Sequence, residues 1–142
     1  MENTIRFIMD RISIEQFAIL TESIPTDEIN LGTQIDFKWS IEEKKVASVA
    51  KFVFVSSEVP FLKLDVLCSF KIEESDWDRQ KGTNGSITLP KGFLCHIAMH
   101  TVGTARGIMH CKTESTPFNY FIIPPINLEQ IIPEDIVAPL VK

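Results

Sequence analysis

Apolar and polar residues alternate over much of the first half of the chain. In residues 61–74 the even positions up to Ile72 are apolar and most of the others are polar, which is the pattern of a strand with one buried face. Residues 33–41 alternate in the same way. Residues 12–19 also alternate, with a slip between Ile14 and Phe17 that a β-bulge would explain. We therefore predict strands in these three segments.

A further predicted strand, residues 46–55, is apolar at both odd and even positions. Such a run is typical of a strand that is covered on both faces of its sheet. Residues 42–45 and 56–60 read as short turns on either side of it, and short turns favour antiparallel pairing. Because the strands come first and a helix follows them, the sequence predicts an α+β fold.

A long amphipathic helix is predicted after the breaker cluster at residues 89–92, because no proline follows before Pro117. At 100° per residue the expected core face consists of Leu94, Ala98, Thr101, Val102, Ala105, Ile108 and Met109. The opposite face carries His96, His100, Gly103, Gly107 and His110. Two interior glycines four residues apart weaken a helix by about 1 kcal/mol each relative to alanine, so we expect another backbone to approach them closely. That backbone belongs either to the same subunit or to a second one, in which case this face is an oligomer interface.

The segment after the helix is strongly apolar. Residues 113–117 end the helix, and the next eight residues hold five large side chains: Phe118, Tyr120, Phe121, Ile122 and Ile123. Two prolines predict an extended loop, which is either buried or kept open for a partner. Asn127 is a predicted N-cap for a short helix over residues 128–132 that Pro133 ends. Residues 76–86 read as a mobile loop, and residues 133–142 as a loosely held tail.

Composition excludes several classes of protein. The chain has 142 residues, enough for one domain spanning 1–142. Its net charge of −5 gives no basic surface for nucleic acid or anionic membrane. There is no apolar run of membrane-spanning length and no signal-peptide layout at the start, so we expect a cytoplasmic protein. Three cysteines without a paired spacing fit a reducing compartment.

Catalytic and metal chemistry have weak support in the sequence. His96 and His100 stand four residues apart on one helix face, as two ligands of one metal would. His110 lies about 20 Å from His96 at 1.5 Å per residue and cannot complete that site within one subunit. No acidic third ligand, Gly-rich phosphate loop, nucleophile elbow or paired-carboxylate signature is present. We therefore expect no metal, no cofactor and no enzymatic activity.

The second half of the chain resembles the SecB export chaperones. Members of that family have an Ala-Arg pair late in the main helix, then an apolar crossover loop with a Phe, then a Pro-(Val/Ile)-Asn-(Phe/Leu) signature. Here the corresponding residues are Ala105, Arg106, Phe118, Pro125, Ile126, Asn127 and Leu128. Residues 70–73 resemble the end of the family's fourth strand. The resemblance covers about a third of the chain.

The resemblance implies a fold and a mechanism. The fold is a four-stranded antiparallel sheet packed with one long helix and a short C-terminal helix. The mechanism is that of an ATP-independent holdase, which binds unfolded or precursor polypeptides in an apolar groove. The residues expected to contact clients are Phe118, Tyr120, Phe121, Ile122 and Ile123. The family assembles as a homotetramer, a dimer of dimers with the long helices between the dimers, which matches the small face at Gly103 and Gly107.

Two departures from the family concern its partners. SecB delivers clients to the translocase motor SecA through an acidic patch on its outer sheet face. This chain has Lys63 near the position where a glutamate of that patch would be expected. Residues 137–142 do not resemble the motor-binding tail. Some relatives hold the antitoxin of a toxin–antitoxin pair, and the sequence does not separate that role from general export. A further alternative is an oligomeric binding module for one partner or a small apolar ligand.

Overall fold

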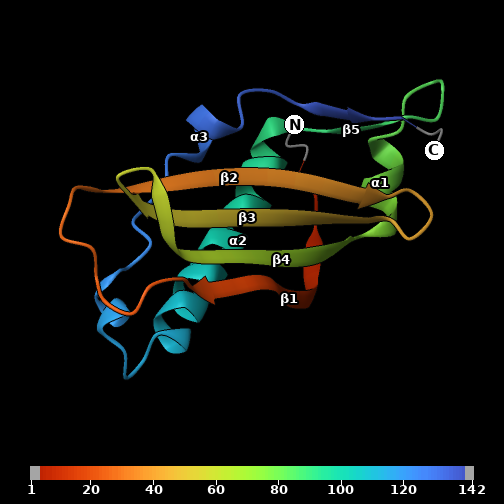
Figure 1. Ribbon diagram of the computed structural model, residues 1–142. Helices are drawn as coiled ribbons and strands as arrows, with labels where there is room; N and C mark the ends of the chain where they lie inside the picture. Colours follow the sequence, from red (N-terminus) through yellow and green to blue (C-terminus); the bar gives the residue numbers. More distant parts are fainter. Residues whose placement is uncertain (1–3, 140–142) are drawn as a thin grey trace.

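The long strands form one antiparallel sheet in Greek-key order (Figure 1). The structure, a computed structural model, describes residues 4–139. The strands are β1 (Phe7–Ile19), β2 (Ile29–Ser40), β3 (Lys45–Ser56) and β4 (Val59–Ile72). Tight turns join β2, β3 and β4, and β1 returns to lie beside β4, so the order is β1-β4-β3-β2. The predicted strands and their antiparallel pairing are confirmed, and β1 and β2 begin earlier than predicted.

The pairing of β1 with β4 is interrupted twice. One register shift lies between Ile14 and Gln16, where the sequence predicts a bulge. A second, between Met9 and Arg11, was not predicted. Each shift inserts an extra residue on β1 and changes which side chains face the helix.

The core lies between one face of the sheet and the long helix. The even-numbered residues of β4 from Leu62 to Ile72 are all buried on this inner face, as the alternation predicts. In β3 the inner residues are buried, whereas Ala47, Val53 and Val55 on the outer face are only half-buried. The prediction that both faces are covered is therefore wrong for residues 4–139, since no described element lies over the outer face (Figure 1).

Helix α2 (Lys91–Lys112) crosses the inner face and contacts mainly β3 and β4 (Figure 1). Its predicted core face is confirmed except at Ile108, which is half-buried. Phe93 and Ile97 are also buried, so the apolar face is wider than predicted. No helix among residues 4–139 has the length and hydropathy to cross a membrane.

Short elements replace the two segments predicted as mobile. Residues 76–86 do not form a free loop, because α1 (Glu74–Arg79) buries Trp77 and Asp76. β5 (Ile87–Leu89) then pairs with β6 (Ile136–Ala138), where Ala138 is fully buried. The tail is therefore held as far as Pro139, and its last three residues lie outside the described chain.

The segment between α2 and the C-terminal helix is only partly extended. It begins with a 3-10 turn, η1 (Pro117–Tyr120), in which the Thr116 side chain accepts a hydrogen bond from the Phe118 amide. The prediction of an extended chain fails there, because a proline suits the first position of a helical turn. The predicted short helix is α3 (Leu128–Ile131), but the Asn127 side chain makes no capping hydrogen bond.

Candidate functional site

The crossover segment, residues 117–127, comprises η1 and the chain that leads from it to α3 along one side of α2. The large side chains predicted to contact clients divide into two groups. Phe118, Phe121 and Ile123 are buried, whereas Tyr120 is 80% exposed and Ile122 is 58% exposed. The prediction that all five are client contacts is therefore wrong for the three buried ones, which complete the core. From Phe121 to Ile123 the backbone is extended, so successive side chains point to opposite sides.

Aromatic packing holds the crossover segment on the sheet. The Phe121 ring centroid lies 5.2 Å from that of Phe54 and 5.4 Å from that of Phe61. The Phe118 ring lies 6.1 Å from Phe61. These distances are typical of favourable ring pairs. Tyr120 and Ile122 are thus presented outward by a segment that is itself fixed.

The Ala105-Arg106 pair has a structural role at the same place. Ala105 is fully buried, as one of the small residues on the core face of α2. The Arg106 guanidinium donates from Nε to the Ile123 carbonyl and from Nη2 to the Pro124 carbonyl at 2.9 Å. Arginine thereby satisfies two successive carbonyls in a segment that lacks regular secondary structure.

A small apolar crevice of about 250 Å³ lies where the crossover segment passes α2. Its lining residues are Met99, Val102, Arg106, Pro125, Ile126 and Leu128. Three of them belong to the predicted Pro-Ile-Asn-Leu signature, whose remaining residue, Asn127, is exposed. Met99 is exposed and lines the crevice, although its place in the sequence did not mark it as a candidate binding residue.

The face of α2 that was predicted to be an oligomer interface is open in the single chain. His96, His100, Gly103, Gly107 and His110 are all exposed. A Cβ atom added at Gly103 or Gly107 would meet nothing within 4 Å, so these glycines are not required by packing inside the subunit. Of the two alternatives for this face, close packing within the same chain is excluded for residues 4–139.

A strip of exposed apolar residues on β1, the β1 strip, adjoins that face. Met9, Ile12 and Ile14 are paired with buried residues of β4 and so point to the helix side of the sheet. They are nevertheless 37%, 53% and 44% exposed, because α2 covers β3 and β4. Phe7, on the same side, packs with its ring centroid 5.3 Å from that of His96. The sequence pattern does not reveal this strip, because the alternation identifies a strand but not its place at the edge.

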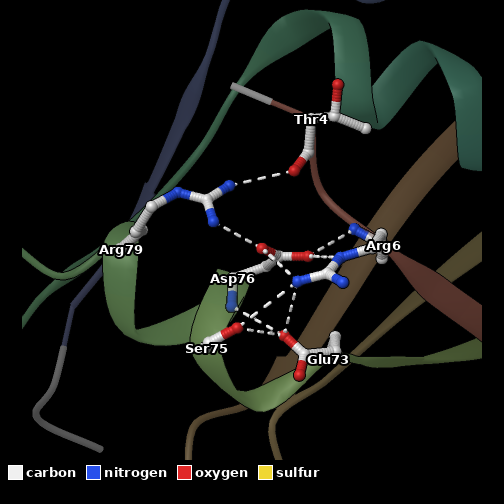
Figure 2. A network of polar contacts seen from close by, with 6 residues as sticks. All are labelled: Thr4, Arg6, Glu73, Ser75, Asp76 and Arg79. Atoms are coloured by element: carbon white, nitrogen blue, oxygen red, sulfur yellow. Dashed lines mark hydrogen bonds and ion pairs between the residues drawn. The ribbon is translucent and has the colours of Figure 1, made fainter. Parts of the chain in front are cut away.

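A polar network fastens the chain before β1 to α1 (Figure 2). The buried Asp76 carboxylate accepts hydrogen bonds from the Arg6 amide at 2.8 Å, from Arg6 Nε at 2.9 Å and from Arg79 Nη1. Arg79 Nη2 also donates to the Thr4 carbonyl at 2.9 Å. Glu73 caps α1 by accepting from the Asp76 amide. The hydrogen bonds from Arg6 hold the pKa of Asp76 well below its usual range.

We expect Asp76→Asn to lower the thermal unfolding midpoint at pH 7 by on the order of 5 °C. A depressed folded-state pKa stabilises the fold above the unfolded value of about 3.9, and this stabilisation is lost as the pH falls further. The wild type should therefore lose more stability than the variant between about pH 5 and pH 2, as measured by circular dichroism. Asp78→Asn, an exposed position on the same helix, is the control. Parallel pH profiles for wild type and Asp76→Asn would contradict the role of the network.

The described residues offer little support for a metal site or a reactive thiol. Residues 4–139 contain no group of three or more His, Cys, Asp or Glu side chains placed to hold a metal ion. The rings of His96 and His100 lie 5.0 Å apart without a third partner of that kind. Burial raises the pKa of the Cys68 thiol, which keeps it protonated.

Comparisons with known proteins assign no function. No family model matches the sequence, and a search of curated proteins finds no match. Among solved structures, a protein of unknown function from Streptococcus agalactiae is similar with a TM-score of 0.39 and 12% sequence identity. The match covers 87% of this chain and 99% of that one. A similarity at this level supports no conclusion about what the chain does.

Proposed function

We propose that this chain is a subunit of an ATP-independent holdase chaperone that resembles SecB. The observation that carries the proposal is the crossover segment. Phe121 and Ile123 fix it in the core, while Tyr120 and Ile122 stand outward and an apolar crevice opens beside it at Met99. Exposed apolar side chains on a fixed backbone are typical of an interaction site.

We call Tyr120, Ile122 and the adjoining crevice at Met99 the ledge. Binding at the ledge requires no nucleotide. Unfolded polypeptides expose apolar side chains, and their removal from water contributes about 25 cal/mol per Å². The ledge is already ordered by Arg106 and by the aromatic cluster of Phe54, Phe61, Phe118 and Phe121. The chaperone therefore loses little conformational entropy when a client binds. Affinity for the unfolded state alone withholds a client from folding or aggregation by mass action.

The proposal includes assembly as a homotetramer, a dimer of dimers. The exposed face of α2 and the adjoining β1 strip form one continuous region in which glycines and aliphatic side chains lie beside each other. A second copy would bury the β1 strip and meet no side-chain obstacle at Gly103 and Gly107. We place the protein in the cytoplasm, where its cysteines would stay reduced.

The test is suppression of aggregation. A denatured model client is diluted into buffer with this protein, and light scattering is followed. The wild type should suppress scattering at a few-fold molar excess, and Tyr120→Ser/Ile122→Ser should lose most of that effect. Both side chains are exposed, so the variant should keep its fold and its oligomeric state.

Val137→Ser is the matched control, because Val137 is 59% exposed and lies on β6, at the α1 end of the molecule. Its suppression should equal that of the wild type. If the wild type fails to suppress scattering at several-fold excess, general chaperoning is wrong. Equal losses in both variants would place the client site elsewhere.

The burial of Phe118, Phe121 and Ile123 favours a second candidate function. With only Tyr120 and Ile122 outward, the apolar area is small for a general holdase and suits an oligomeric binding module for one partner or a small apolar ligand. A dedicated chaperone of one antitoxin lies between the two. Saturable binding of one partner, with no effect on unrelated denatured clients, would identify the module. Delivery to the motor SecA has no observation in its favour here.

A further inference from the structure

The outer face of the sheet has an ordered distribution of charge, which the strand register defines. Residues paired directly across antiparallel strands share a face. Lys63 and Lys71 of β4 are paired with outer residues of β3, and Arg11 of β1 is paired with Ser69. The basic residues that the register places on this face are Arg11, Lys38, Lys45, Lys51, Lys63 and Lys71.

Two acids on the same face are paired with these cations, whereas Asp65 is buried without an ion pair among residues 4–139. Asp10 lies 2.9 Å from Lys45 Nζ, and Asp36 lies 3.2 Å from Lys51 Nζ. Arg11, Lys38, Lys63 and Lys71 form no ion pair among residues 4–139. The chain as a whole has a net charge of −5. This face is therefore a local excess of positive charge on an acidic protein.

One pair on this face works against the stability of the sheet. Lys45 and Lys71 stand directly opposite each other on β3 and β4, and like charges in that position are destabilising. The hydrogen bond and ion pair with Asp10 raise the pKa of Lys45, and Arg11 opposes that rise as a third positive charge nearby. A local conflict between like charges is typical of a functional surface.

Two apolar residues lie at the centre of the outer face, between the cations. Val49 is buried and Leu67 is half-buried at the centre of the sheet, and they are direct cross-strand partners. Beside them a hollow of about 250 Å³ opens at Gly32, and Lys51, Val53, Lys63 and Asp65 are among its lining residues. Asp65 is only 9% exposed, and its buried Oδ1 has no hydrogen-bond partner among the described residues.

We propose that the outer sheet face docks an acidic polypeptide segment that also carries aliphatic side chains. Its carboxylates would meet Lys63, Lys71, Lys38 and Arg11, and its aliphatic side chains would cover Leu67. An apolar centre with a charged rim is the usual anatomy of a protein interface. A nucleic acid would leave the apolar centre uncovered. This surface lies on the other side of the sheet from α2, so the inference does not rest on the holdase proposal.

The experiment uses the full chain and a fluorescein-labelled peptide of alternating Glu and Leu, with an alternating Lys and Leu peptide of equal length as comparison. Binding is followed by fluorescence anisotropy at two salt concentrations. The test variant is Lys63→Glu/Lys71→Glu. The control is Lys81→Glu/Lys112→Glu, which changes the net charge equally at exposed positions away from this face.

The acidic peptide should bind the wild type and the control variant alike, and at least about tenfold more weakly to the test variant. Added salt should weaken binding, because exposed charges are screened. Equal binding to both variants, preference for the basic peptide, or no binding would each overturn the proposal. Tighter binding of a single-stranded oligonucleotide of equal length would also overturn it. A change of oligomeric state in the test variant alone, seen by sedimentation, would assign the face to a second copy of this chain.

Discussion

Phe61→Ala is expected to lower the free energy of unfolding by about 3–5 kcal/mol, the usual loss for a buried phenylalanine. Phe61 is fully buried. Its ring centroid lies 5.4 Å from Phe121, 6.1 Å from Phe118 and 6.3 Å from Phe54. The substitution therefore leaves a cavity and removes the common partner of the two rings that anchor the crossover segment. Urea unfolding monitored by circular dichroism measures the loss.

Tyr120→Ala is the matched control for this prediction. Tyr120 belongs to the same apolar segment but is 80% exposed, so its removal should change the free energy of unfolding by less than about 0.5 kcal/mol. If Phe61→Ala lost less than about 1 kcal/mol, the aromatic cluster would not be what fixes the crossover segment. The ledge would then be flexible, and the argument for an ordered client site would fail.

Ile12→Asp/Ile14→Asp is expected to convert the assembled protein into monomers. In the proposed assembly the β1 strip is covered by a second copy, and an unpaired buried carboxylate is strongly unfavourable. In the single chain both positions are about half exposed, so the subunit should still fold. Sedimentation velocity at several protein concentrations distinguishes the two states.

Leu20→Asp/Val59→Asp is the control, with the same charge change at positions of 54% and 58% exposure. These side chains lie outside the β1 strip, so this variant should assemble like the wild type. A wild type that is monomeric at every concentration would rule out the tetramer. Dissociation of both variants would show that added negative charge, and not the β1 strip, controls assembly.

The sequence was sufficient for the elements that carry their own periodicity. β4 and α2 are long, and each has one buried face, so the pattern of residues predicts both the element and its core side chains. The short elements were missed because their stability comes from distant partners. Asp76 is held by Arg6, and β6 is paired with β5, which lies nearly 50 residues earlier in the chain. The sequence around Asp76 and Ala138 contains turn-forming residues, and its apolar residues follow neither a helical nor a strand period.

The candidate site was predicted by residue type but not by orientation. The apolar character of residues 118–123 identified the crossover segment, and the helix face with Gly103 and Gly107 was correctly placed opposite the core face. Which loop side chains point outward depends on how the segment lies on the sheet, as Phe121 and Ile122 illustrate. The β1 strip depends on strand order, because the same residues at a central position would be buried beneath α2.

The Greek-key order also has a consequence for synthesis of the chain. β1 ends at Ile19, but its partner β4 begins only at Val59. At about 5–20 residues per second, the first strand waits on the order of 2–10 s on the ribosome before its neighbour emerges. The contact between Arg6 and Asp76, 70 residues apart, forms later still. During that interval the isoleucines and phenylalanines of β1 are unpaired, so the nascent chain itself has the property that defines the clients we propose for the finished protein.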